Sequence, residues 1–174
     1  MKLKFLLLAA LLGALVSFAW GSVAHVSNLF PSVTPRAFAD STGVVQFMKA
    51  NAPENGVYFE GRGLLAVVSF RSDLGPRFPS LVAPLLKQLL VEIGVAFLLA
   101  WVLLRLPLWP AWGTGSLFAT LGLAAGIAQL FPEGIWYGLP MPFVLAEVAI
   151  LVIGWFLMGW VIGALRNRIF AAAA

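Results

Sequence analysis

Residues 143–165 read FVLAEVAILVIGWFLMGWVIGAL, and Glu147 is the one ionisable side chain in this run. A hydrocarbon core about 30 Å thick is crossed by about 20 mostly apolar helical residues, so this stretch predicts a transmembrane helix. Three further runs, Phe5–Ala24, Val82–Leu104 and Gly113–Phe131, reach that length or come within a residue or two of it. The chain is therefore expected to be a multi-pass membrane protein with four spans.

The composition of the 174 residues agrees with this class. Apolar residues make up 61% of the chain and charged residues 10%, whereas a soluble domain carries about 25% charged residues. The net charge of +4 does not indicate nucleic acid, because the basic residues are not interleaved with aromatic ones in a block. The absence of cysteine excludes disulfides, thiolate-bound zinc and iron–sulfur clusters.

The first apolar run has features of both a secretory signal and a membrane anchor. Lys2 and Lys4 precede it, and Ser22-Val23-Ala24 offers a small-x-small cleavage site. The run is longer than the apolar core of a signal peptide, which has about 7–15 residues. Trp20 also stands near its end, where interfacial aromatic residues are enriched. We therefore expect residues 1–24 to be an uncleaved anchor.

The distribution of basic residues predicts the orientation. Five of them flank the spans on one side without an acidic residue among them: Lys2, Lys4, Arg105, Arg166 and Arg168. The positive-inside rule places both termini and the 105–112 loop in the cytoplasm. Segment 25–80 and the 132–142 loop, which carries Trp136 and Tyr137, would then lie outside. The length of segment 25–80 lessens the weight of its own basic residues.

Segment 25–80 is predicted to fold as a small αβ insert. An extended connector over 26–36 precedes a short helix whose N-cap is Asp40, and the turn residues 51–56 end that helix. Residues 57–59 and 64–70 form a hairpin that turns at 60–63 and leads through 71–80 into the second span. The expected fold is an all-α membrane bundle of four helices, N-in and C-in, with this extracytoplasmic insert between helices 1 and 2. Residues 81–170 form helices 2–4.

Polar residues inside the spans are the first candidates for function, and five are predicted to gather in the outer half of the membrane: Lys87, Gln88, Glu92, Gln129 and Glu147. A charge at mid-bilayer costs about 2.5–3.5 kcal/mol on insertion scales, so such residues usually face the bundle interior and find a partner. One interpretation is an ion or proton site, or a pocket for a substrate headgroup. The other is a structural cluster in which Lys87 pairs with Glu147 or Glu92.

His25 is the only histidine, and it would lie just outside the first span. It could ligate a metal or a chlorophyll magnesium, sense pH, or simply be an interfacial polar residue. A metal site made by this chain alone is not expected, because the remaining ligands would be scattered carboxylates. No catalytic triad or phosphate-binding loop is found. We therefore expect neither an enzyme nor a cofactor of its own, beyond contacts with lipid or pigment.

Small residues recur every four positions in three of the spans. Such faces let helices approach closely in lipid, either within one chain or against a partner subunit. The residues expected to pack in this way are Gly13, Ser17, Gly21, Gly122, Gly126, Gly159 and Gly163.

The chain also resembles a family of small, functionally uncharacterised bacterial inner-membrane proteins. The similarity lies in Trp20-Gly21, in residues 52–59 (APENGVYF) and in residues 152–156 (VIGWF). The resemblance implies four helices and an outer αβ insert, and it carries over no catalytic residue. The leading hypothesis is a non-catalytic accessory subunit of a respiratory or photosynthetic complex in the bacterial inner membrane, with lipids and other integral membrane subunits as partners. The alternative is a small transporter or lipid-handling protein that uses the polar cluster.

Overall fold

The computed structural model describes residues 1–27, 29–34, 37–52, 54–60, 64–68 and 82–170. The described helices are α1 (Lys2–Val26), α2 (Ser41–Asn51), α3 (Val82–Leu103), α4 (Ala111–Tyr137) and α5 (Met141–Phe170), with a 3-10 turn, η1 (Pro31–Val33), and two strands, β1 (Gly56–Glu60) and β2 (Leu64–Val68). Helices α1, α3, α4 and α5 are each long and apolar enough to cross a membrane, which confirms four helices of spanning length at the predicted places. The chain divides into two units, Pro35–Ala83 and the remainder.

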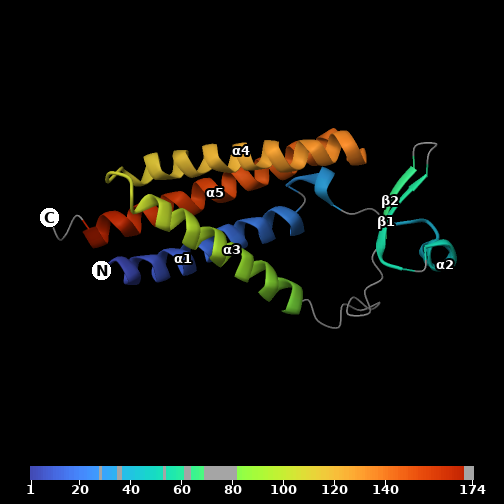
Figure 1. Cartoon of the computed structure of the whole chain (residues 1–174), viewed down its shortest axis with the longest axis horizontal. Helices are drawn as coiled ribbons and strands as arrows, with labels where there is room; N and C mark the ends of the chain where they lie inside the picture. The colour runs from blue at the N-terminus through green and yellow to red at the C-terminus, as the bar shows by residue number, and fades with distance from the viewer. Residues whose placement is uncertain (28, 35–36, 53, 61–63, 69–81, 171–174) are drawn as a thin grey trace. The chain divides into compact units, whose positions relative to one another are not determined.

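Helix α5 is the centre of the larger unit. It packs along α4 on one side and along α1 on another, and η1 contacts it as well. In Figure 1, α4 (yellow to orange) runs antiparallel beside α5 (red), and α1 (blue) also lies beside α5. The beginning of α1 and the end of α5 share one end of this unit with the α3–α4 connection (Figure 1). We call this the basic end, because it carries Lys2, Lys4, Arg105, Arg166 and Arg168.

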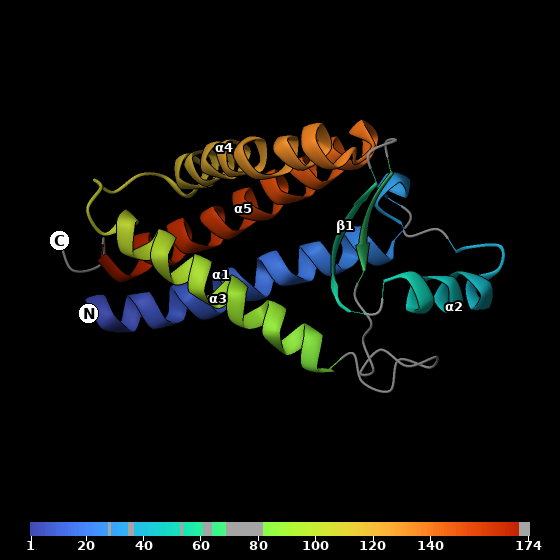
Figure 2. The same cartoon turned by 45° about the vertical axis from the view of Figure 1, so that its right-hand side comes forward.

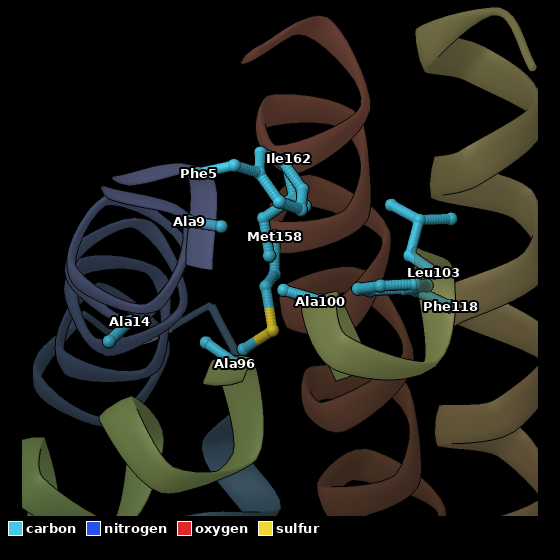
Figure 3. Packing of buried hydrophobic residues seen from close by; sticks show 9 residues of the cluster. All are labelled: Phe5, Ala9, Ala14, Ala96, Ala100, Leu103, Phe118, Met158 and Ile162. Carbon is cyan, nitrogen blue, oxygen red and sulfur yellow. The ribbon is translucent and has the colours of Figure 1, made fainter. Parts of the chain in front are cut away.

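The core of this unit is formed where three helices meet α5. Met158 and Ile162 of α5 are fully buried, and Figure 3 shows Met158 extending toward Ala96 of α3. Small side chains at the contact points let the helices approach closely. The buried cluster consists of Phe5, Ala9, Ala14, Ala96, Ala100, Leu103, Phe118, Met158 and Ile162.

Helix α3 joins this core with only its second half. Ala96, Ala100 and Leu103 are buried, whereas all the residues from Val82 to Val91 are at least partly exposed. Figures 1 and 2 agree that the first half of α3 (green) diverges from α1 and α5. About half of this predicted span therefore has few partners among the described residues.

Helix α4 is longer than the sequence predicted. It continues through Pro132 to Tyr137 and ends at Gly138, whose φ of 68° is left-handed. The predicted loop 132–142 was therefore wrong in its bounds, and Trp136 and Tyr137 lie in the last helical turn. A proline removes one backbone N–H, and membrane helices tolerate this when the freed carbonyl finds another partner. Pro132 therefore does not end the helix, although the predicted span stops directly before it.

The described part of the predicted insert agrees with the predicted elements. Helix α2 begins directly after Asp40, whose Oδ1 accepts from the backbone N–H of Gly43 at 2.8 Å. Strands β1 and β2 pair antiparallel in a register that places Gly56 opposite Val68. The predicted connector 26–36 is not wholly extended, because it contains the helical turn η1. This turn belongs to the larger unit and contacts α5. The first residue of the predicted turn 60–63 is the last residue of β1. The rest of that turn, the end of the second strand at 69–70 and the connector 71–80 lie outside the described residues, as do residues 171–174.

Candidate functional site

The end of α1 is held to the beginning of α5 by one aromatic side chain. The indole Nε1 of Trp20 donates to the carbonyl oxygen of Ile150 at 2.9 Å. A Cβ atom added at Gly154 would lie 3.1 Å from Cδ1 of Trp20 and 3.4 Å from the hydroxyl of Ser17. The missing side chain at position 154 therefore makes room for the indole. We call Trp20, His25, Glu147, Ile150 and Gly154 the α1–α5 junction.

His25 and Glu147 meet at the same junction. Nε2 of the histidine lies 3.2 Å from Oε1 of the glutamate, and Nδ1 lies 2.8 Å from the carbonyl oxygen of Gly21. The carbonyl can only accept, so Nδ1 carries a proton in this arrangement. The contact between Nε2 and Glu147 is then also a hydrogen bond, provided that either Nε2 or the carboxyl group carries a proton. The side chains of His25 and Glu147 are 47% and 22% exposed, so the pair is not sealed in the core.

This geometry bears on the hypotheses for His25. Both ring nitrogens have partners, so a metal or a chlorophyll magnesium would have to displace one of them. Among the described residues, no group of three or more histidine or acidic side chains is placed to hold a metal ion. The sequence offered no signal for the His25–Glu147 contact, because the two residues lie on different helices.

The polar residues of α3 interact with each other. Nε2 of Gln88 donates to Oε1 of Glu92 at 3.2 Å, one helical turn away. Lys87 is exposed and forms no ion pair with a described residue. The pairing of Lys87 with Glu92 or Glu147, which the sequence left open, is absent from this structure. Residues five apart on a helix are separated by about 140° around its axis, so Lys87 and Glu92 do not share a face.

Gln129 is engaged in the same way on α4, where its Nε2 donates to Oε1 of Glu133 at 3.1 Å. The described contacts thus place four of the five polar residues in three separate pairs: Gln88–Glu92 on α3, Gln129–Glu133 on α4 and His25–Glu147 at the junction. No described hydrogen bond or ion pair joins one of these pairs to another. Each pair is consistent with local satisfaction of a polar group, which a hydrocarbon environment makes necessary.

Arg166 and Asn167 have a structural role that the sequence analysis did not predict. Arg166 is 6% exposed, and its guanidinium donates to the carbonyl oxygens of Pro107 at 2.9 Å and Leu106 at 2.5 Å. Nε of the same side chain is buried without a described partner. Asn167 Nδ2 donates to the carbonyl oxygen of Trp109 at 3.0 Å. The end of α5 therefore binds the connection between α3 and α4.

A sequence signal for this contact existed in the proline residues of that connection. Pro107 and Pro110 interrupt helical structure, which leaves nearby carbonyl groups without helical donors. A buried arginine with several N–H groups can satisfy more than one of them. The sequence predicts for Arg166 only a role in membrane orientation. Its burial and its two hydrogen bonds show that it also connects α5 to the α3–α4 connection.

The predicted small-residue faces lie mostly between helices of this chain. A Cβ atom added at Gly159 would lie 2.7 Å from the ring of Phe118, and one at Gly13 would lie 2.8 Å from Ile162. Ser17 is buried, and Gly21 has no such neighbour within 4 Å. The remaining close approaches place Gly122 against Trp155, Gly126 against Val148 and Gly163 against Thr114.

An apolar groove of about 250 Å³ runs between α1 and α5, toward the basic end. Its lining consists of Leu12, Trp160, Val161, Ala164, Leu165 and Arg168. Arg168 is the only charged member, and it is exposed. No protein-family model, curated protein or solved structure matches this chain.

Proposed function

We propose that the chain is a non-catalytic accessory subunit of a larger membrane complex, and that α3 is the helix through which it docks. The observation that carries this proposal is the environment of Glu92. Its carboxylate stands near the middle of α3 and is bound by Gln88 of the same helix. On the same face of the helix, one and two turns before Glu92, Gln88 is exposed and Leu85 is 45% exposed.

The energetics of the membrane favour a partner at this position. An acidic side chain at the centre of a membrane helix costs about 2.5–3.5 kcal/mol on insertion scales. A single hydrogen bond from Gln88 leaves further acceptor sites on the carboxylate, since an ionised carboxyl group offers about four. A helix of another subunit that brings a hydrogen-bond donor or a basic side chain would occupy these sites. The partly exposed face of α3 is where such a helix has access.

The same geometry favours this function over a transporter or lipid-handling protein built on the polar cluster. A single binding site for a substrate or ion needs polar side chains from several helices to point into one place. Glu92 and Glu147 instead have separate described partners, on α3 and α1 respectively. We further propose that both termini are cytoplasmic and that the insert is extracytoplasmic, because the basic end collects the flanking cations. The bacterial inner membrane, and a respiratory or photosynthetic complex within it, remain predictions of the sequence.

The test is purification of the tagged chain from its native membranes in a mild detergent, with identification of co-purifying proteins. We expect other integral membrane subunits at a fixed stoichiometry, and we expect Glu92→Leu to release them. Glu133→Leu is the matched control, because Glu133 is held by a glutamine one turn away in the same manner. Circular dichroism checks that both variants keep their helical content.

Two outcomes would contradict the proposal. The first is a chain that purifies alone as a stable monomer from native membranes. The second is a Glu133→Leu variant that loses its partners as completely as Glu92→Leu, because docking would then not depend on α3.

A further inference from the structure

We propose that the groove between α1 and α5 binds one acyl chain of an anionic phospholipid, whose phosphate lies at Arg168. This site is independent of the docking function proposed for α3, because it lies on other helices. The inference rests on three observations: the lining of the groove, the position of its one cation and the surplus of positive charge around it.

The groove is suited to hydrocarbon. Leu12, Val161 and Leu165 contribute aliphatic walls, and Ala164 leaves space between them. Its volume of about 250 Å³ exceeds the roughly 150 Å³ of an engineered apolar cavity that holds benzene. Trp160, which is 50% exposed, supplies a flat apolar surface at the side. A segment of an acyl chain fits both this size and this chemistry.

Arg168 supplies the recognition of the headgroup. Its side chain is exposed and forms no ion pair with a described residue, so its guanidinium is available to an anion. A guanidinium binds phosphate oxygens through paired, charge-assisted hydrogen bonds. Two turns of α5 separate Arg168 from the level of Trp160, so an acyl chain that lies along the groove continues from a phosphate held at Arg168.

The charge around the groove opening favours an anionic lipid over a zwitterionic one. The rings of Phe5 and Phe170 contact edge to face with centroids 5.5 Å apart. This contact brings the beginning of α1, with Lys2 and Lys4, to the same end as Arg168. Helix α1 contains no acidic residue, and neither does α5 beyond Glu147. Each basic residue near a membrane surface adds attraction for anionic lipids.

The headgroup, and not the acyl chain, is expected to decide the selectivity. In a bilayer the chain leaves one hydrocarbon environment for another, so its burial in the groove brings little hydrophobic gain. All common phospholipids can offer a chain to the groove, but a headgroup such as phosphatidylglycerol, unlike phosphatidylcholine, brings no positive charge of its own close to Arg168. The measurable property is therefore a preference among headgroups.

The experiment measures lipid retention by native mass spectrometry after purification with equal amounts of phosphatidylglycerol and phosphatidylcholine. We expect one phosphatidylglycerol to be retained per chain in preference to phosphatidylcholine. Arg168→Gln is expected to reduce that preference about fivefold, the effect of one basic residue near the headgroups. Ala164→Phe, which fills the groove, is expected to reduce the retention of both lipids. Arg105→Gln is the matched control, because Arg105 is an exposed cation at the same end that does not line the groove. Its guanidinium carbon lies over the ring of Trp101, 3.3 Å from the ring centroid.

Three results would overturn the proposal. Equal retention of the two lipids by the unaltered chain would remove the role of the cation. An Arg105→Gln variant as weak as Arg168→Gln would show only general attraction to the basic end. Unchanged lipid retention in Ala164→Phe, together with a shift from oligomer to monomer, would assign the groove to a helix of a second copy.

Discussion

The side chain of Trp20 is bound to the backbone of Ile150, with 2.9 Å between the indole Nε1 and the carbonyl oxygen. The same carbonyl belongs to the helical turn that leads to Gly154, where the absence of a side chain admits the indole ring. A carbonyl oxygen has two lone pairs, so it can accept from the indole in addition to its helical partner. Trp20 therefore binds α1 to α5, in addition to standing where interfacial aromatic residues are enriched.

The first prediction tests that contact. Trp20→Phe keeps an aromatic ring against Gly154 but removes the donor. We expect the free energy of unfolding in detergent micelles to fall by about 1 kcal/mol, the net value of a typical hydrogen bond. Trp136→Phe is the control, because Trp136 is 80% exposed near the end of α4. A loss in the control equal to that in Trp20→Phe would assign the effect to the change of residue type and not to the bond.

The second prediction concerns the close packing of α4 against α5. The Cβ atom of Gly159→Ala would lie 2.7 Å from the ring of Phe118 and 2.8 Å from the carbonyl oxygen of Thr114. A backbone oxygen cannot move away as a flexible side chain can, so the helices must separate. We expect a loss of about 1–3 kcal/mol in the free energy of unfolding, typical of overpacking.

The control for this substitution is Gly94→Ala in α3, where an added Cβ has no neighbour within 4 Å. Alanine favours helix formation over glycine, so this variant is expected to be at least as stable as the unaltered chain. Thermal unfolding of both variants in the same detergent makes the comparison. If Gly159→Ala also gained stability, the α4–α5 contact would have to be looser than the structure shows.

The sequence predicted those features that depend on short stretches of chain. The four spans follow from apolar length, the start of α2 from the capping oxygen of Asp40, and the hairpin from two apolar stretches around a glycine-rich turn. These signals are local, because a bilayer or a helix end imposes its requirement on consecutive residues. The end of α4 was predicted wrongly because the span was bounded by its apolar run, which ends at Phe131, whereas the helix continues to Tyr137.

The partners of the polar side chains could not be predicted in the same way. His25 meets Glu147 only because α1 packs on α5, and helix packing depends on how side chains of both helices interlock. The burial of Arg166 likewise depends on where the α3–α4 connection passes. Sequence periodicity gives the face on which a residue lies, but it does not give the neighbouring helix.

The third prediction tests the role of Arg166. Arg166→Gln removes the guanidinium that donates to the carbonyl oxygens of Leu106 and Pro107. We expect a loss of about 2–3 kcal/mol in the free energy of unfolding, because hydrogen bonds from a charged group are stronger than neutral ones and the two carbonyl groups lose their donor. The α3–α4 connection is also expected to open.

Trypsin cleavage after Arg105 measures that opening, since Arg105 stands directly before the bound carbonyls. We expect cleavage in micelles to be faster in Arg166→Gln than in the unaltered chain. The matched variant is Arg168→Gln, which removes an exposed arginine from the same helical turn and is expected to leave the cleavage rate unchanged. Equal rates in all three proteins would show that Arg166 does not hold the connection.

The fourth prediction separates a structural from a functional role for the His25–Glu147 pair. The two side chains are 47% and 22% exposed, and exposed ion pairs contribute about 0.2–1 kcal/mol in double-mutant cycles. We therefore expect a coupling energy in this range from the unfolding of His25→Gln, Glu147→Gln and the double variant. A coupling of about 3 kcal/mol or more, which is typical of buried charges that lose their partner, would contradict this exposure. The junction would then be shielded from water.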